Sequence, residues 1–244
     1  MESVLLPSLI VLFASLLQTC TGFGFAIFAT PFLLFFYPAQ TAIQLNIILS
    51  IVLSLLMIPK VRHDVDRVLL GRLVKGSIPG AAAGIGVFLL LNVDLLRLVI
   101  GIVVLSLSTL LLLRFRINAK RAWDFAAGAI SGLFTTSLGM PGVPLLLYFS
   151  GTELDKATLR STTLSFFLFI YTVALVMQML FASTNDQIWF TALALLPALV
   201  VGMLLGQILF RHINQETFRY LSLVILLATG GYLLWSSMLT SGPV

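Results

Sequence analysis

The stretch Ser137–Phe149, SLGMPGVPLLLYF, lies inside a long apolar run but interrupts any helix that the run could form. Its six residues from Gly139 to Pro144 include two glycines and two prolines. Within an uninterrupted helix they would cost on the order of 8 kcal/mol, at about 3 for each proline and about 1 for each glycine. The stretch therefore predicts a turn inside the apolar run 124–150.

The whole chain is apolar enough for a membrane protein. Of its 244 residues, 59% are hydrophobic and 9% are charged, and the mean hydropathy is +1.10. A soluble domain of this size needs more surface charge. Apolar runs occur at 4–37, 41–59, 73–91, 95–113, 124–150, 157–182, 187–210 and 217–238, and several are long enough to cross a bilayer. We predict an all-α polytopic membrane protein whose surroundings are the lipid bilayer.

The charged residues and the cysteine exclude several other classes. The net charge is +5, but the basic residues lie in short loops between apolar runs, which is typical of topology determinants, so we expect no nucleic acid partner. Cys20 is the only cysteine, so no internal disulfide can form. His63 and His212 lie in loops, and no metal cluster, cofactor motif or catalytic motif is recognisable. We expect no enzyme activity, no metal and no cofactor.

An internal repeat divides the chain. The run Thr21–Phe36, TGFGFAIFATPFLLFF, is similar to Ser137–Phe149 and aligns Pro31 with Pro144. Further on, IPGAAAGIG at 78–86 matches LPALVVGMLLG at 196–206. The offsets grow smoothly along the chain, which predicts a first membrane repeat at 1–118 and a second at 119–244.

The distribution of basic residues predicts the topology. Eight full crossings would divide the 14 Lys and Arg nine against five, which is a weak bias. If segments 4–37 and 124–150 each enter and leave on the same side, 13 basic residues face the cytoplasm and only Arg97 faces outside. We therefore predict two inverted repeats, each a broken re-entrant helical hairpin followed by three transmembrane helices. Both termini are then expected outside the cytoplasm.

Inverted repeats with broken helices are typical of secondary transporters, which bind substrate near the midplane between the breaks. Half-helices that begin after Gly24 and Gly142 would present free N–H groups and a partial positive charge to an anion. Small polar side chains of the hairpins and of the following helices would add hydrogen bonds. The candidate substrate-binding residues are Thr19, Thr21, Gly22, Gly24, Pro31, Asn46, Thr136, Ser137, Gly139, Met140, Pro141, Gly142, Pro144, Arg160 and Ser161.

One of these assignments, and the glycines outside the two turns, have ordinary alternatives. Arg160 could bind the anion, or it could mark the cytoplasmic end of a helix and extend toward the interface. Glycines can also serve helix packing, which is the role we favour for Gly84, Gly86, Gly202 and Gly206.

The motifs GMPGVPLLLYF and LRSTTLSFF, with VRHDVDRVLLGRLVKGSIPGAAAGIG and its counterpart LPALVVGMLLGQIL, resemble the sulfite exporter TauE/SafE family of bacterial permeases. The resemblance extends over nearly the whole chain. It implies transport of sulfur-containing anions such as sulfite, or of organosulfonates such as sulfoacetate, across the bacterial inner membrane. Family members also include permeases for other small anions.

Three functions remain open at this stage. The first is a secondary transporter that exports a small sulfur-containing anion, and the second is an anion channel that uses the same hairpins as a filter. The third is a membrane scaffold or assembly protein whose hairpins only pack. All nine acidic residues lie in loops or at segment ends, so no mid-membrane carboxylate is available to relay protons. A homodimer is a further expectation.

Overall fold

The computed structural model describes residues 2–90, 121–149, 154–182 and 184–210, with Thr152 and a few separate positions between 95 and 109. These residues are helical, and no strand occurs among them. The predicted segment 217–238 and most of 95–113 lie outside the described residues, as do Arg97, Arg211 and Arg219.

The predicted hairpin segments each consist of two helices joined by a short turn. The first gives α1 and α2, and the second gives α6 and α7. The helices run in the order α1 (Glu2–Thr21), α2 (Phe25–Leu33), α3 (Ala39–Val61), the short 3-10 helix η1 (Arg62–Asp64), α4 (Arg67–Leu90), α6 (Arg121–Leu138), α7 (Gly142–Phe149), α8 (Lys156–Phe181) and α9 (Asp186–Leu209).

The charged connection after α3 is shorter than the gap at 60–72 between the apolar runs 41–59 and 73–91, because both flanking helices extend into it. Asp66 begins α4 early: its carboxylate accepts hydrogen bonds from the amides of Val68 and Leu69, both at 2.9 Å. A carboxylate in this position satisfies amides that a helix start leaves free. The amide of Asp66 donates to the Thr162 hydroxyl at 3.0 Å and so fixes the start of α4 beside α8.

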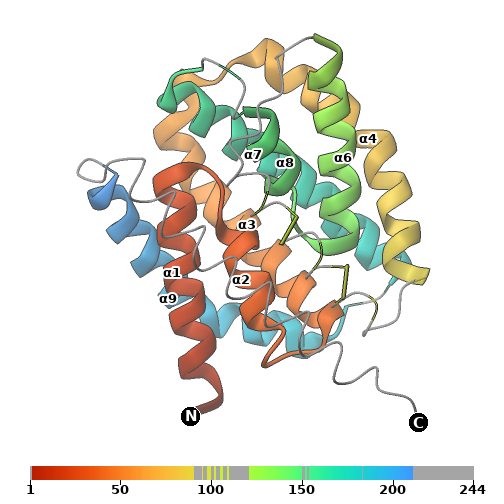
Figure 1. Ribbon diagram of the computed structural model, residues 1–244. Coiled ribbons are helices and arrows are strands. Elements are labelled where there is room, and N and C mark those ends of the chain that lie inside the picture. Colours follow the sequence, from red (N-terminus) through yellow and green to blue (C-terminus); the bar gives the residue numbers. More distant parts are fainter. Residues whose placement is uncertain are drawn as a thin grey trace.

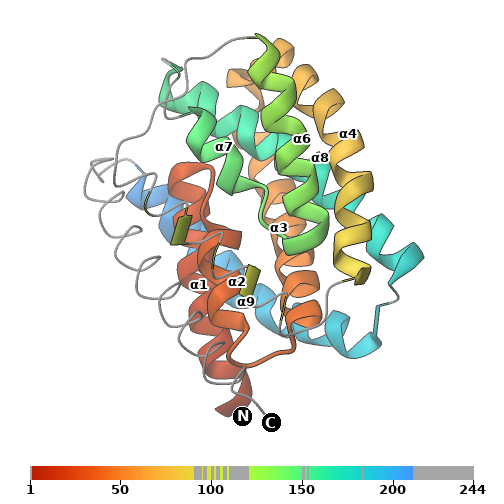
Figure 2. The same cartoon turned by 45° about the vertical axis from the view of Figure 1, so that its right-hand side comes forward.

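The two helix pairs run in opposite directions in Figures 1 and 2. The helix α1 rises from the end marked N and α2 returns beside it, whereas α6 descends from the opposite end and α7 returns upward. The long helices α3 and α8 pack against one another between them. Helix α3 forms much of the core, where Ile43, Leu45, Ile47, Leu49, Leu53 and Met57 are fully buried.

Three side-chain contacts gather the basic connections at one end of the fold. Asp66 bonds Thr162 near the start of α8, as described above. The Lys60 ammonium group donates to the Gln207 side chain at 2.7 Å, which brings the end of α9 to the end of α3. Arg72 of α4 pairs with Asp124 in the first turn of α6 at 2.8 Å. The connections after α3 and before α8 therefore lie on the same side of the molecule.

Among the described helices, α1, α3, α4, α8 and α9 are long and apolar enough to cross a membrane. Their outer faces are apolar too: Leu180, Phe190 and Leu193 are 73%, 72% and 63% exposed. Large apolar side chains in such numbers on an outer surface are suited to lipid rather than water. The chain is a multi-pass membrane protein.

Glycines hold two helix pairs at very close range. A Cβ atom at Gly80 of α4 would lie 1.8 Å from the Ala129 carbonyl oxygen of α6, and one at Gly128 would lie 2.2 Å from the Leu73 carbonyl oxygen. Helices α9 and α1 meet in the same way, since a Cβ at Gly202 would lie 2.1 Å from the Leu12 carbonyl oxygen. Only glycine fits at such distances.

The packing role expected for four glycines is therefore confirmed for three of them. Gly84, Gly202 and Gly206 face the neighbouring helix directly, whereas Gly86 has no atom within 4 Å of its Cβ position. The pairing is reciprocal between the predicted repeats: α4 of the first packs on α6 of the second, and α9 of the second packs on α1 of the first.

Candidate functional site

The first turn lies between α1 and α2, where Gly22 and Gly24 have φ angles of 83° and 115°. Residues with a side chain rarely adopt such angles, which explains both glycines. The Thr21 hydroxyl donates to the Leu17 carbonyl at 2.8 Å and accepts from the Phe23 amide at 3.2 Å. Thr21 therefore stabilises the turn from within.

A backbone amide at the start of α2, directly after Gly24, also has a hydrogen-bond partner in the protein. The Gln18 side-chain oxygen accepts a hydrogen bond from the Phe25 amide at 3.3 Å. The Gln18 amide nitrogen is buried and has no partner. Thr19 of α1 faces α9, because a Cβ at Gly206 would lie 2.8 Å from its Cβ. Pro31 is buried within α2.

Arg160 of α8 lies directly beside this first turn. A Cβ atom at Gly22 would be 3.0 Å from the Arg160 Cα, so the two backbones are in contact. The Arg160 side chain stacks on Phe210, with 4.2 Å from the guanidinium carbon to the ring centroid. Arg160 is only 8% exposed, its Nε has no partner, and no carboxylate pairs with it in the part of the chain described. Ser161 beside it is buried and donates to the Thr158 carbonyl at 3.0 Å.

The second turn ends α6 at Gly139, whose φ is 70°. The Gly139 amide donates to the Thr135 carbonyl at 2.9 Å, and the Met140 amide to the Phe134 carbonyl at 3.1 Å. These two bonds satisfy carbonyl groups of the last turns of α6, and the left-handed backbone at Gly139 ends the helix where the sequence predicts a break. Met140, Pro141 and Pro144 are all buried.

Thr136 and Ser137 are occupied by local hydrogen bonds. The Thr136 hydroxyl donates to the Ala81 carbonyl of α4 at 3.0 Å, and the Ser137 hydroxyl to the Leu133 carbonyl at 2.6 Å. The Thr136 hydroxyl therefore links α6 to α4, whereas the Ser137 hydroxyl bonds within α6. The second turn presents the carbonyl groups at the end of α6 to its neighbours.

Three side chains of α3 and α8 bind those carbonyl groups. The Asn46 side-chain amide donates to the Gly139 carbonyl at 2.6 Å, and the Tyr171 hydroxyl reaches the same oxygen at 3.4 Å. The Gln178 side-chain amide donates to the Thr136 carbonyl at 3.0 Å. Sequence reasoning identified Asn46 but missed Tyr171 and Gln178. A polar residue within an apolar membrane helix, as in VMQML around Gln178, is the signal that could have found them.

Each of the two turns contacts a helix of the other predicted repeat. The first turn, at Gly22, contacts α8 of the second predicted repeat through Arg160. The second turn, at Gly139, contacts α3 of the first through Asn46. Between the turns, Gly142 at the start of α7 is enclosed by apolar groups: its Cβ position lies 3.5 Å from both Ile27 and Phe167. The start of α7 is thus drier than the start of α2.

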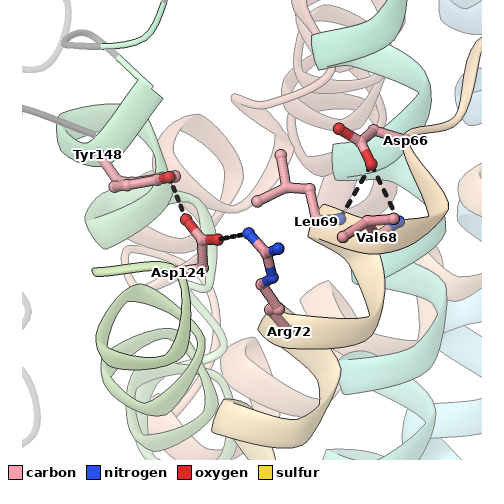
Figure 3. A network of polar contacts seen from close by, with 6 residues as sticks. All are labelled: Asp66, Val68, Leu69, Arg72, Asp124 and Tyr148. Atoms are coloured by element: carbon pink, nitrogen blue, oxygen red, sulfur yellow. Dashed lines mark hydrogen bonds and ion pairs between the residues drawn. The ribbon is translucent and has the colours of Figure 1, made fainter. Parts of the chain in front are cut away.

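A polar network links α6 and α7 at the end that lies away from the Gly139 turn (Figure 3). The Arg72 guanidinium group donates to Asp124 at 2.8 Å, and the Tyr148 hydroxyl donates to the other carboxylate oxygen of Asp124. Asp124 is 4% exposed. Sequence reasoning counted Arg72 and Asp124 only as charges near a segment end, so this network was not predicted.

The family model for the sulfite exporter TauE/SafE matches residues 8–233, which is nearly the whole chain. The chain belongs to the TauE/SafE family. Comparisons of this TauE/SafE chain with curated proteins and with solved structures found no match. The match confirms the expected family membership, and the family suggests a membrane transporter of sulfur-containing anions.

The interior of this TauE/SafE protein contains buried polar atoms that other protein groups do not satisfy. Such atoms are costly, so each calls for a water molecule or a ligand. They are Gln18 Nε2, Thr19 Oγ1, Thr30 Oγ1, Asn46 Oδ1, Ser50 Oγ, Ser54 Oγ, Ser131 Oγ, Arg160 Nε and Gln178 Oε1. The described residues contain no group of three His, Cys, Asp or Glu side chains that could hold a metal ion.

Proposed function

We propose that the protein is a secondary transporter that exports a small sulfur-containing anion, such as sulfite or an organosulfonate like sulfoacetate. The family supports transport of this class of anion. In our proposal, the anion binds near the midplane between two re-entrant hairpins, α1–α2 and α6–α7, which belong to inverted repeats at 1–118 and 119–244.

The observation that carries the proposal is the buried state of Arg160. Taking a guanidinium group out of water costs several kcal/mol unless an opposite charge compensates it. Arg160 is 8% exposed, and no described carboxylate compensates it. A charged side chain at such a position in a membrane protein is functional by default. A transported anion beside the Gly22 turn would supply the missing charge.

The surroundings of Arg160 favour a small oxyanion that binds and leaves again. A guanidinium group binds planar pairs of oxygen atoms well, and the Gln18 side-chain nitrogen one turn before Gly22 is a further unpaired donor. No second arginine or lysine within the described residues shares this turn. One fixed charge with neutral donors attracts an anion without holding it permanently.

The position of the basic connections supports an orientation as well. The connections at 62–66 and before Lys156 lie at one end of the fold, and the basic residues around them favour the cytoplasmic side. With that end inside, α1 begins outside. The inside-negative potential of the inner membrane then favours anion exit by about 2.3 kcal/mol per charge per 100 mV.

A thermal-stability panel with purified protein tests the substrate class. Sulfite, sulfoacetate, sulfate and acetate are added separately as sodium salts at equal ionic strength, and the unfolding midpoint is measured. We expect the largest rise with sulfite or the sulfonate, and a loss of that rise in Arg160→Gln. The control is Arg62→Gln, which removes one positive charge at an exposed position in the connection after α3. A rise that Arg160→Gln keeps in full would contradict the proposed site.

Flux measurements in liposomes distinguish a transporter from a channel or a scaffold. Saturable and slow efflux that Arg160→Gln abolishes and Arg62→Gln retains supports the transporter. Flux that rises linearly with anion concentration would favour a channel. Absence of flux in the folded wild-type protein for all anions of the panel would favour a scaffold.

A further inference from the structure

The end of α6 gathers neutral oxygen atoms around one point. The Gly139 carbonyl lies 2.6 Å from the Asn46 side-chain nitrogen and 3.4 Å from the Tyr171 hydroxyl. Ser50 lies one turn after Asn46 on α3, and its hydroxyl is buried without a hydrogen-bond partner. Gly139, Asn46, Tyr171 and Ser50 thus form a compact set of oxygen donors from three elements, which we call the Gly139 cluster.

The electrostatics of the Gly139 cluster are opposite to those at Arg160. A helix C-terminus carries a partial negative charge, because its last carbonyl groups point outward. The end of α6 is of this kind, and its turn and side chains of α3 and α8 bind its carbonyl groups. Asp124, at the start of α6, is 15 residues and about 22 Å away along the helix. The cluster therefore combines partial negative charge with no carboxylate.

Two buried atoms of the Gly139 cluster lack a partner, Asn46 Oδ1 and Ser50 Oγ. The Asn46 side chain is fully buried, and its Oδ1 has no partner although its Nδ2 is bonded to Gly139. Burying an unsatisfied carbonyl oxygen costs about 1–3 kcal/mol. The Gly139 carbonyl itself has a second lone pair, so it can accept from Asn46 and still bind another partner. The Gly139 carbonyl and the Asn46 side chain bonded to it therefore offer two oxygens with lone pairs still free.

We propose that the Gly139 cluster binds a sodium ion. Its ligands would be the Gly139 carbonyl oxygen, Asn46 Oδ1 and the hydroxyl oxygens of Tyr171 and Ser50, with water completing the shell. Hard cations bind oxygen ligands, and divalent cations generally require carboxylates, which the cluster lacks. Neutral oxygens at an unwound helix end are suited to a singly charged ion.

The location also suggests how the ion acts. The anion proposed at Arg160 and the sodium ion at Gly139 would lie at the two turns, and each turn contacts the other repeat. A ligand at either turn would therefore alter how the repeats meet, which is the basis for coupling two ligands. This coupling rests on the proposed transport function, whereas sodium binding itself does not.

The test measures the unfolding midpoint of the purified full-length protein without any sulfur anion. Sodium, lithium, potassium and choline chloride are compared at equal ionic strength. At a sodium concentration about tenfold above Kd, we expect a midpoint about 3 to 6 °C higher in sodium than in choline chloride. Potassium should give a much smaller rise, since its larger radius requires more ligands.

Three variants distinguish a bound ion from a structural water molecule. Asn46→Asp adds negative charge at the ligand position, so its stability should depend more steeply on sodium than that of the wild type. Tyr171→Phe removes one ligand and should lose part of the sodium-specific rise. Thr172→Val is the matched control, because the Thr172 hydroxyl is on the exposed side of the same helix and donates to the Leu168 carbonyl. It should retain the full rise.

The outcomes separate this inference from the transport proposal. Equal midpoints in sodium, potassium and choline chloride, or a larger rise in potassium, would overturn the sodium site. The same holds if Asn46→Asp loses stability equally in all four salts, as a broken hydrogen bond to Gly139 would predict. A sodium-specific rise in a protein that shows no anion flux would support the ion site and refute the transport function alone.

Discussion

The Tyr148 hydroxyl donates a hydrogen bond to the Asp124 carboxylate and thereby joins the two helices of the α6–α7 hairpin at the end away from the Gly139 turn. The same carboxylate pairs with Arg72 of α4 (Figure 3). One buried carboxylate therefore holds three elements together, and its loss should loosen the hairpin as a unit.

We expect Asp124→Asn to lower the free energy of unfolding by about 1–3 kcal/mol, because it weakens a charge-assisted bond and leaves Arg72 unpaired. Arg72 is 29% exposed on its side chain, so water compensates part of the loss. Thermal unfolding of Asp124→Asn, Arg72→Gln and the double variant measures the coupling. Effects that simply add in the double variant would show that the pair contributes no energy of its own.

Gly80 and Gly86 offer a matched pair on α4. Gly80→Ala should severely destabilise the protein, because its Cβ position lies 1.8 Å from the Ala129 carbonyl oxygen, and α4 must move away from α6. Gly86→Ala, with nothing within 4 Å, should be neutral or stabilise the helix by about 1 kcal/mol. Midpoints of purified protein test both. Similar midpoints for the two variants would refute close α4–α6 packing.

The glycines of the two turns should differ in their tolerance of a methyl group. Gly22→Ala combines a φ of 83° with a Cβ 3.0 Å from the Arg160 backbone, so we expect a loss of about 1–3 kcal/mol. Gly142→Ala meets only ordinary contacts at 3.5 Å and should fold normally. Thermal unfolding again provides the measurement. Equal tolerance at both positions would mean that Gly22 is not held against α8.

The proposed topology makes position 152 accessible from the cytoplasm. In a Cys20→Ala background, which lacks any other cysteine, Thr152→Cys should react with an impermeant maleimide in inside-out vesicles and not in intact cells. A cysteine placed near the N-terminus, at Ser3, should show the reverse pattern. Labelling of both positions from the same side would overturn the proposal that α6 and α7 enter and leave the membrane together.

The turns were the part of the fold most accessible to sequence reasoning. Glycine and proline act through the backbone, so their meaning does not depend on distant neighbours, and the breaks at Gly24 and Gly139 are where the sequence predicted them. The start of α4 at Arg67 was not predicted, because the many charged residues around Asp66 indicated a loop and concealed its role as an N-cap.

The side-chain roles were less accessible, because they depend on which helix lies opposite. Thr136 and Ser137 were expected to face a ligand, yet their hydroxyls bind the Ala81 and Leu133 carbonyls. Tyr171 and Gln178 read as ordinary members of an apolar helix until the end of α6 is placed beside them. The sequence shows that a residue is polar, but it does not show which group on a neighbouring helix forms a hydrogen bond with it.

The reciprocal contacts of the helices also bear on how such a chain could have arisen. The glycine-mediated pairs α4–α6 and α1–α9 each join one half to the other. Two separate half-length chains, inserted in opposite orientations, could form these contacts as an antiparallel dimer. We therefore expect residues 1–118 and 119–244, expressed as two polypeptides, to be retained and co-purify only when made together. A duplicated and fused gene would then have made permanent an assembly that began between two copies.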